Sequence, residues 1–221
     1  MENGETVWLG DMPIGPLHKP PTTAVPFSFV YQGRHSRDFL SDWERTHSVR
    51  DLDHHRRELT LQYRDPETGL EVRCVAIEYL KFPVVEWKLL FKNASQKSTP
   101  IIEKILPLDL RHERDNEGEF ILYHSNGSPH SLVKMSDPTD YAPRETRLGT
   151  QSVHRLSSKI GLPASHDLPF FNLEANGRGV IFAIGWPGQW EATLTRDQGQ
   201  GIEIQAGQQG THFKLLPGEE V

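Results

Sequence analysis

The sequence predicts an all-β protein whose strands form two large antiparallel sheets stacked face to face. Apolar residues recur with a two-residue period from Pro26 onward, which is typical of strands with one buried and one solvated face. No segment keeps a sustained helical period. About eleven or twelve strand-like runs can be recognised, too many for one small immunoglobulin-like sandwich.

Composition and charge exclude several classes of function. Hydrophobic residues make up 36% of the 221 residues and charged residues 24%, as in an ordinary globular protein. The net charge of −6 gives a nucleic-acid partner no electrostatic support. No apolar run reaches the length of about 18 residues that a membrane span needs, so no membrane association is expected. Cys74 is the only cysteine, which excludes an intrachain disulfide and favours a buried hydrophobe over a nucleophile.

Residues 1–25 and 26–221 differ in character. The first stretch is rich in Pro and Gly and predicts an irregular leader that lies over the sheet surface. The second predicts a single β-sandwich domain. The segment Met1–Pro26 lacks the basic start and apolar core of a signal peptide. Two compartments therefore remain possible. The protein is either cytoplasmic or secreted after removal of a signal that this sequence does not contain.

Alternation predicts the elements of the first half of the chain. In order they are a strand from Pro26, a short helix over 36–43 capped by Ser36, and strands over 57–63, 71–79 and 84–93. The segment Asp65–Gly69 is a turn that joins two strands as a hairpin, because Pro presets the backbone and Gly takes a positive φ. The inward positions are Phe27, Phe29, Tyr31, Leu59, Leu61, Tyr63, Val85, Trp87, Leu89 and Phe91.

The second half alternates again, with one long interruption. Pro107 divides an apolar run and indicates an edge or a bulge. The next strand places Phe120, Leu122 and His124 on one face. Residues 125–167 are crowded with Ser, Asn, Pro, Asp and Gly and predict a long connection, of a kind that is often functional. Strands resume near Phe170, Val180, Trp190, Ile202 and Thr211.

An aromatic elbow, Gly185–Trp190, joins two of these later strands. Tryptophan offers a flat apolar face that suits the C–H face of a sugar ring, and the Gln189 amide can both donate and accept hydrogen bonds. Trp186 and Trp190 also continue the alternation of the flanking strands, and that period alone favours a core position for both. The elbow is therefore either core or a carbohydrate-facing surface.

Other residues that carry chemistry give weaker signals. His124 ends its strand beside the long connection and is predicted to contact a ligand. At His54-His55 a solvated turn is favoured over a metal site. The sequon at Asn126 is more simply a turn. The sequence has no zinc-protease motif, no nucleophile elbow and no phosphate-binding loop, and spacing cannot select a pair of catalytic carboxylates. We therefore predict no catalytic residue, no metal and no cofactor.

Seven runs together resemble a known family. They are PFSFVYQGRHS (26–36), DPETGLEVRC (65–74), FPVVEWKLLFKN (82–93), YHSNGS (123–128), LPFFNLE (168–174), VIFAIGWPGQWEA (180–192) and LLPGEEV (215–221). In this order they resemble the N-terminal domain of α-galactosidases of the melibiase type, glycoside hydrolase clan D, family 36-like. The resemblance implies a β-supersandwich of the galactose-mutarotase kind. In the family, a (β/α)₈ barrel follows and carries both catalytic aspartates of a retaining mechanism, and no position of this sequence matches them.

The resemblance implies a non-catalytic domain that packs on the missing barrel and helps to wall the sugar pocket. Its partners would be that barrel and a galactoside or other carbohydrate, and a homo-oligomer stays open. An apolar patch larger than is usual on monomers is then expected to be exposed. The residues expected to face the sugar are Trp186, Gln189, Trp190, Asn126 and His124, with the loop from Asn126 to about Arg144.

Two alternatives remain. One is a free-standing carbohydrate-binding sandwich that uses the elbow. The other is a mutarotase-type epimerase, which only the fold analogy supports, since no matching His and Glu motif is found.

Overall fold

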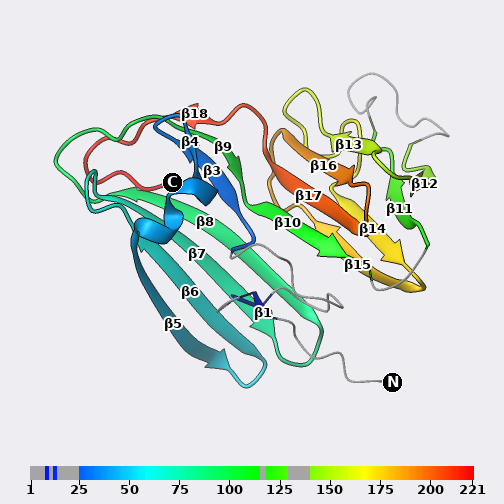
Figure 1. Cartoon of the computed structure of the whole chain (residues 1–221), viewed down its shortest axis with the longest axis horizontal. Coiled ribbons are helices and arrows are strands. Elements are labelled where there is room, and N and C mark those ends of the chain that lie inside the picture. The colour runs from blue at the N-terminus through cyan, green and yellow to red at the C-terminus, as the bar shows by residue number, and fades with distance from the viewer. Residues whose placement is uncertain (1–7, 10–11, 14–24, 115–117, 129–139) are drawn as a thin grey trace. The chain divides into compact units, whose positions relative to one another are not determined.

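The computed structural model describes residues 8–9, 12–13, 25–114, 118–128 and 140–221 (Figure 1). Within these ranges the chain is almost entirely β, and every strand pair is antiparallel, which confirms the predicted all-β sandwich class. The helices found there are two 3-10 turns, η1 (Ser36–Asp38) and η2 (Leu40–Asp42). No helix in the described part is long and apolar enough to cross a membrane.

The expected leader falls mostly outside the described residues. Within it, β1 (Trp8–Leu9) and β2 (Met12–Pro13) form a two-stranded antiparallel pair. The chain divides into two compact units. The first comprises residues 1–107 and 210–221, and the second comprises residues 108–209. The boundary of one domain over 26–221 stays a prediction.

The first unit contains two four-stranded sheets. One is a meander of consecutive strands, β5 (Glu44–Asp53), β6 (Arg56–Arg64), β7 (Leu70–Tyr79) and β8 (Val84–Asn93). The other has the order β18 (His212–Phe213), β9 (Ile102–Leu106), β3 (Ser28–Tyr31) and β4 (Arg34–His35). The C-terminal strand therefore returns to pair with β9, and it closes this unit with a segment far away in the sequence.

An aromatic cluster forms the core of the first unit. The predicted inward residues of β3 and β6 are buried, as expected from their alternation. Phe29, which is 0% exposed, meets Phe39 and Phe91 edge to face, with ring centroids 5.8 and 5.3 Å apart, and Trp43 at 6.2 Å. Cys74 is buried in the same cluster, and burial raises the pKa of its thiol, so the expected role as a hydrophobe is confirmed.

The prediction of one helix over 36–43 is wrong. The structure has two separate 3-10 turns, and Ser36 does not cap them. Its buried hydroxyl accepts a hydrogen bond from the backbone N–H of Phe29, so the residue is held by the neighbouring strand. The N-terminal cap is His35, whose Nδ1 accepts from the backbone N–H of Arg37. The apolar side chains of this segment, Phe39, Leu40 and Trp43, pack on the core.

The turn predicted at Asp65–Gly69 joins β6 and β7 as a hairpin. The Asp65 carboxylate accepts from the backbone N–H of Glu67 at 3.1 Å and from Thr68 Oγ1 at 2.5 Å. Gly69 has a φ of 73°, a region that glycine enters without strain. These contacts make the turn a rigid corner of the first unit.

The second unit also contains two four-stranded sheets. The first has the order β10 (Leu108–Glu113), β17 (Gly201–Gln208), β16 (Trp190–Arg196) and β13 (Val153–Ser157). The second has the order β12 (Pro143–Leu148), β11 (Phe120–Ser125), β14 (Phe170–Ala175) and β15 (Arg178–Ala183). The buried hydrophobic side chains of this unit include Phe120, Leu122, Leu148, Leu156, Phe171, Leu173, Trp190, Leu194, Ile202 and Ile204.

The prediction of a long connection over 125–167 is wrong, because β12 and β13 lie within this range. Each strand lies at the edge of its sheet. Each buries one hydrophobic side chain, Leu148 in β12 and Leu156 in β13, and the other positions are mostly polar. Such strands show no two-residue apolar period, so alternation could not identify them. Residues 129–139 of the predicted loop lie outside the described residues.

We expect Phe29→Ala to lower the free energy of unfolding by about 3–5 kcal/mol, because it empties the centre of the aromatic cluster. Phe82→Ala is the matched control, since Phe82 is 66% exposed, and it is expected to change stability by less than about 0.5 kcal/mol. Denaturant unfolding of the three proteins measures both values. Similar losses in the two variants would contradict a core centred on Phe29.

Candidate functional site

The two tryptophans of the elbow lie in different environments. Trp190 begins β16 and is 0% exposed, and its Nε1 donates to the carbonyl oxygen of Pro163 at 2.7 Å. Trp186 lies in the turn before β16 and is 42% exposed. The core position that periodicity favours therefore holds for Trp190 and fails for Trp186, because the strand ends at Ala183. In the second unit, Trp186 is the indole that solvent reaches.

Gly188 allows the Trp186 indole to fold back over the turn. A Cβ added at Gly188 would lie 2.7 Å from Trp186 Nε1, so any other residue would displace the indole from this position. Ser158 holds the other side of the turn, since its hydroxyl accepts from the Trp190 backbone N–H at 2.9 Å and donates to the Gly188 carbonyl at 3.4 Å. The exposed indole is thus presented by a supported loop.

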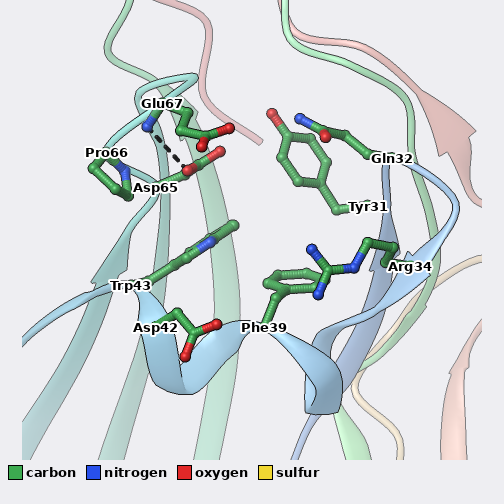
Figure 2. Close-up of a pocket in the computed structure, with 9 residues that line it drawn as sticks. All are labelled: Tyr31, Gln32, Arg34, Phe39, Asp42, Trp43, Asp65, Pro66 and Glu67. Atoms are coloured by element: carbon green, nitrogen blue, oxygen red, sulfur yellow. Dashed lines mark hydrogen bonds between the residues drawn. The ribbon is translucent and has the colours of Figure 1, made fainter.

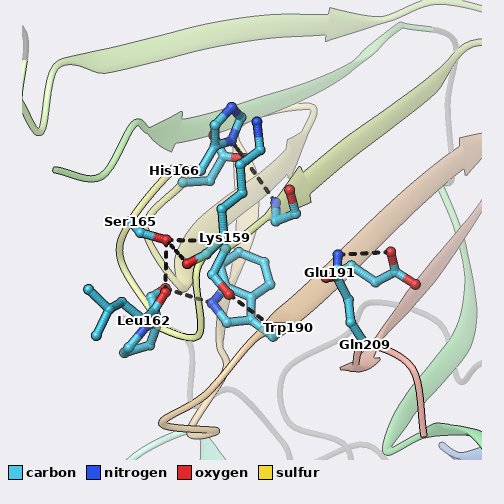
Figure 3. Close-up of polar contacts among 11 residues, drawn as sticks. Lys159, Leu162, Ser165, His166, Trp190, Glu191 and Gln209 are labelled. Atoms are coloured by element: carbon cyan, nitrogen blue, oxygen red, sulfur yellow. Dashed lines mark hydrogen bonds and ion pairs between the residues drawn. The ribbon is translucent and has the colours of Figure 1, made fainter. Parts of the chain in front are cut away.

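Gln189 is exposed but already paired. Its side-chain Nε2 donates to Gln209 Oε1, and its Oε1 accepts from the backbone N–H of Gly161 at 3.3 Å. Gln209 in turn donates to a carboxylate oxygen of Glu191 at 3.3 Å (Figure 3). The amide therefore fixes the elbow to its neighbours, and a ligand would have to compete for it.

A two-residue hairpin beside the elbow was not predicted from the sequence. Lys159 and Leu162 pair across Ile160 and Gly161, whose φ angles are 51° and 74°. A β-branched residue at positive φ is strained, and such strain is often associated with function. Ile160 is 68% exposed and Leu162 41%. Ser165 stabilises the hairpin by accepting from the Lys159 backbone N–H at 2.7 Å (Figure 3). Gly161 is a turn residue, but the isoleucine before it is not, and the sequence therefore carries no clear sign of a hairpin.

His124 is on β11 and is 7% exposed. Its Nε2 lies 3.0 Å from Thr146 Oγ1, and its ring meets that of His154 edge to face at 4.9 Å. His124 Nδ1 and His154 Nε2 have no hydrogen-bond partner among the described residues. Burial lowers the pKa of both rings, and the neighbouring His154 lowers that of His124 further, against a smaller opposite effect of Asp167. This environment holds both imidazoles neutral.

Asn126 pairs with Asp167 in an isolated bridge instead of forming the predicted turn. Position 127 requires glycine, because an added Cβ would lie 1.9 Å from the Ala164 carbonyl oxygen. Asp167 also accepts from the Ser157 backbone N–H at 2.9 Å. Of the five residues predicted to face a sugar, Trp186, Gln189 and Trp190 lie in the elbow. His124 lies near the end of β11 and Asn126 follows that strand, which pairs with neither β15 nor β16.

The solvated turn favoured at His54-His55 agrees with the structure. The Asp53 carboxylate accepts from the His55 backbone N–H and from the Arg56 guanidinium, as in an ordinary polar turn. Across the described ranges, no group of three or more His, Cys, Asp or Glu side chains is arranged to hold a metal ion.

Comparison with solved structures shows the fold. The α-galactosidase AgaB of glycoside hydrolase family 36 from Geobacillus stearothermophilus is 17% identical, with a TM-score of 0.69 over 96% of this chain. A variant of AgaA from the same organism, in complex with raffinose, is 18% identical, with a TM-score of 0.68 over 94%. The α-galactosidase from Lactobacillus brevis is 14% identical, with a TM-score of 0.65 over 98%.

The chain spans less than a third of these enzymes, 29% of AgaB, 30% of the AgaA variant and 29% of the Lactobacillus brevis protein. No protein-family model matches the sequence, and no curated protein does. At these identities the likeness shows architecture, and it confirms the expected β-supersandwich class.

Trp190→Ala is expected to lower the free energy of unfolding by about 3–5 kcal/mol, because a buried indole and its hydrogen bond are lost. Trp186→Ala is expected to lower it by about 1 kcal/mol or less, since that indole is partly exposed. Thermal and urea unfolding of both variants test this difference. The assignment of the two indoles fails if Trp186→Ala is the more damaging change.

The His124–His154 pair predicts a loss of stability in mild acid. In the unfolded chain both rings titrate near the ordinary pKa of about 6.5. Because their folded pKa values are lower, the unfolded state binds more protons below that pH, and stability falls from pH about 6.5 down to the folded pKa values.

His154→Phe keeps an aromatic ring beside His124 and removes one titrating group, so unfolding temperatures between pH 7.5 and 5 should fall less steeply than in the parent. The exposed His47→Gln is the control and should follow the parent protein. Parallel curves for the parent and His154→Phe would argue against the pair as the source of this pH dependence.

Proposed function

We propose that this chain is the non-catalytic N-terminal domain of an α-galactosidase-like glycoside hydrolase. In this role it packs on a (β/α)₈ barrel and helps to wall the sugar pocket. The observation that carries the proposal is the fold match, which covers nearly the whole chain and under a third of each α-galactosidase. The remaining length of those enzymes leaves room for a barrel of about 250 residues. The seven sequence runs support the same assignment.

The outer apolar face of the second unit supports the packing role. It comprises Tyr123, Phe170, Ile181 and Ala183 on three adjacent strands. Ile181 is 76% exposed, Phe170 57% and Tyr123 36%. Tyr123 pairs with Asn172, which pairs with Ile181, and Phe170 pairs with Ala183, so these side chains share one side of the sheet. An exposed apolar sheet face of this kind marks an interaction surface.

The elbow supports the role as a wall of the sugar pocket. The exposed Trp186 indole suits the C–H face of a sugar or an apolar loop beside it. Ile160 and Leu162 add exposed apolar surface on the adjoining hairpin. Trp190 and Gln189 anchor this surface through their hydrogen bonds to the 160–163 segment. In this proposal one indole faces the pocket and the other holds the loop.

A second candidate function is a free-standing carbohydrate-binding sandwich. The exposure of Trp186 favours it, because sugar-binding modules use exposed aromatic faces. It predicts saturable binding of a galactoside by this chain alone, with loss of binding in Trp186→Ala. Calorimetry with raffinose measures this, and absence of heat in the parent protein would remove this candidate.

The domain proposal is tested by co-producing the chain with the segment encoded after Val221. The chain alone is expected to leave a chromogenic α-galactoside intact, and the complex to hydrolyse it. Ile181→Glu should weaken the association at least about tenfold, since it buries an unpaired charge in the contact. Val153→Glu is the control, because Val153 is 52% exposed and lies on the other sheet.

Turnover by the chain alone, or a following segment that encodes no barrel, would contradict the proposal. Equal effects of the two glutamate variants would remove the outer apolar face as the contact. Gel filtration of the chain alone shows whether the same face instead joins two copies.

A further inference from the structure

The first unit contains a pocket that the proposed role does not use. It has a volume of about 250 Å³, and three segments that the fold brings together line it (Figure 2). These are the β3–β4 turn, the two 3-10 turns, and the hairpin between β6 and β7. The lining residues are Tyr31, Gln32, Arg34, Phe39, Asp42, Trp43, Asp65, Pro66 and Glu67.

Hydrogen bonds through Thr68 hold the pocket in shape. The Tyr31 hydroxyl lies 2.7 Å from Thr68 Oγ1, which also donates to the Asp65 carboxylate at 2.5 Å. Burial raises the pKa of Tyr31 to about 12, so its hydroxyl keeps a proton at any physiological pH. These contacts tie the β3 side of the pocket to the β6–β7 hairpin, so this part of the wall is in place before a ligand arrives.

Aromatic rings form one side of the pocket. Trp43 meets Tyr31 edge to face at 6.0 Å and Phe39 at 5.1 Å with an interplanar angle of 35°. Tyr31 and Phe39 are 3% and 6% exposed, whereas Trp43 is only partly buried. The free surface on this side belongs mostly to the Trp43 indole, which suits the C–H face of a sugar ring.

Polar groups of both kinds surround the same space. The side chains of Gln32, Arg34, Asp42 and Glu67 are drawn around it in Figure 2, and these residues are exposed. The guanidinium donates, the carboxylates accept, and the amide does both. A ligand hydroxyl needs a donor and an acceptor nearby, and this set supplies them.

The charges of the lining select against anions. Asp42, Asp65 and Glu67 repel an anion. The Arg34 guanidinium, 5.6 Å from the Phe39 ring centroid, occupies the cation position over that ring and offsets one of the three carboxylate charges. No metal-holding group of His, Cys, Asp or Glu side chains exists in the part of the chain that the structure describes. The mixture of donors and acceptors favours a neutral, hydroxyl-rich molecule, and a cation is the charged alternative to test.

The backbone at Gln32 is strained beside the pocket. Gln32 and Gly33 form the two-residue turn between β3 and β4, with φ angles of 53° and 73°. Glutamine is an unfavourable choice for such a turn, where Asn or Gly fits better. Its amide lies at the pocket rim (Figure 2). Strain carried by a residue that lines a pocket is often associated with ligand binding.

From these observations we propose that the first unit binds a single neutral sugar ring in this pocket, at a site separate from the elbow. The volume is below the range of about 300–1,000 Å³ usual for drug-sized ligands, which favours one ring over an oligosaccharide. The site needs neither the barrel nor Trp186, so it does not depend on the proposed role as an α-galactosidase domain.

The test is an NMR titration of the whole chain, read at the indole N–H resonances. The probes are D-galactose, D-glucose, D-mannose and D-xylose, with tetramethylammonium and inorganic phosphate as the charged alternatives. The Trp43 resonance is expected to shift saturably with at least one sugar at millimolar concentration and to ignore both ions. The double variant Asp42→Asn/Glu67→Gln is expected to weaken sugar binding about tenfold or more, because it removes two charged acceptors.

Two control variants distinguish binding in this pocket from a general charge effect and from binding at the elbow. Asp38→Asn/Glu44→Gln makes the same charge change at exposed positions outside the pocket and should leave the affinity unchanged. Trp186→Ala should also leave it unchanged. The proposal is overturned if Trp43 responds to no sugar, if tetramethylammonium or phosphate binds more tightly, if the pocket and control variants behave alike, or if the response is lost in Trp186→Ala.

Discussion

One fully buried aromatic side chain in each unit holds the loops that carry the candidate sites. Phe29 lies against rings from the 3-10 turns and from β8, and so holds the wall of the pocket against the sheets. Trp190 ties the elbow to the Pro163 carbonyl and, through Ser158, to the neighbouring hairpin. In both places a buried aromatic residue positions the exposed residues nearby. The geometry of those exposed side chains therefore depends on packing in the core.

Much of the fold could be predicted from the sequence because most strands bury one face. The bounds of β8 agree with the predicted run, and the hairpin at Asp65–Gly69 has its own turn residues. The edge strands β12 and β13 could not be predicted, since each buries one hydrophobic side chain. The prediction of a helix over 36–43 was wrong for another reason. The Ser36 hydroxyl bonds to a strand that is near in space, and local sequence does not show this.

The candidate sites were less predictable than the fold. Trp186 and Trp190 both fit a two-residue period, and only the end of β15 at Ala183 separates the exposed indole from the buried one. The pocket of the first unit draws on three segments of the chain, and nothing in the sequence showed that these segments meet. A site that tertiary contacts assemble from distant segments has no characteristic residue spacing in the sequence. A sheet with one buried face does, because its apolar residues alternate.

The turn at Ile160 has a consequence for anyone who stabilises this chain. Glycine or asparagine at this φ would relieve strain on the order of 1 kcal/mol or more, so a consensus-style design would replace the isoleucine early. That gain would remove the large apolar group from the tip of the hairpin beside the elbow. In the proposed role as a pocket wall, thermal tolerance and surface recognition are therefore opposed at this single position. A screen for heat resistance alone would select against recognition.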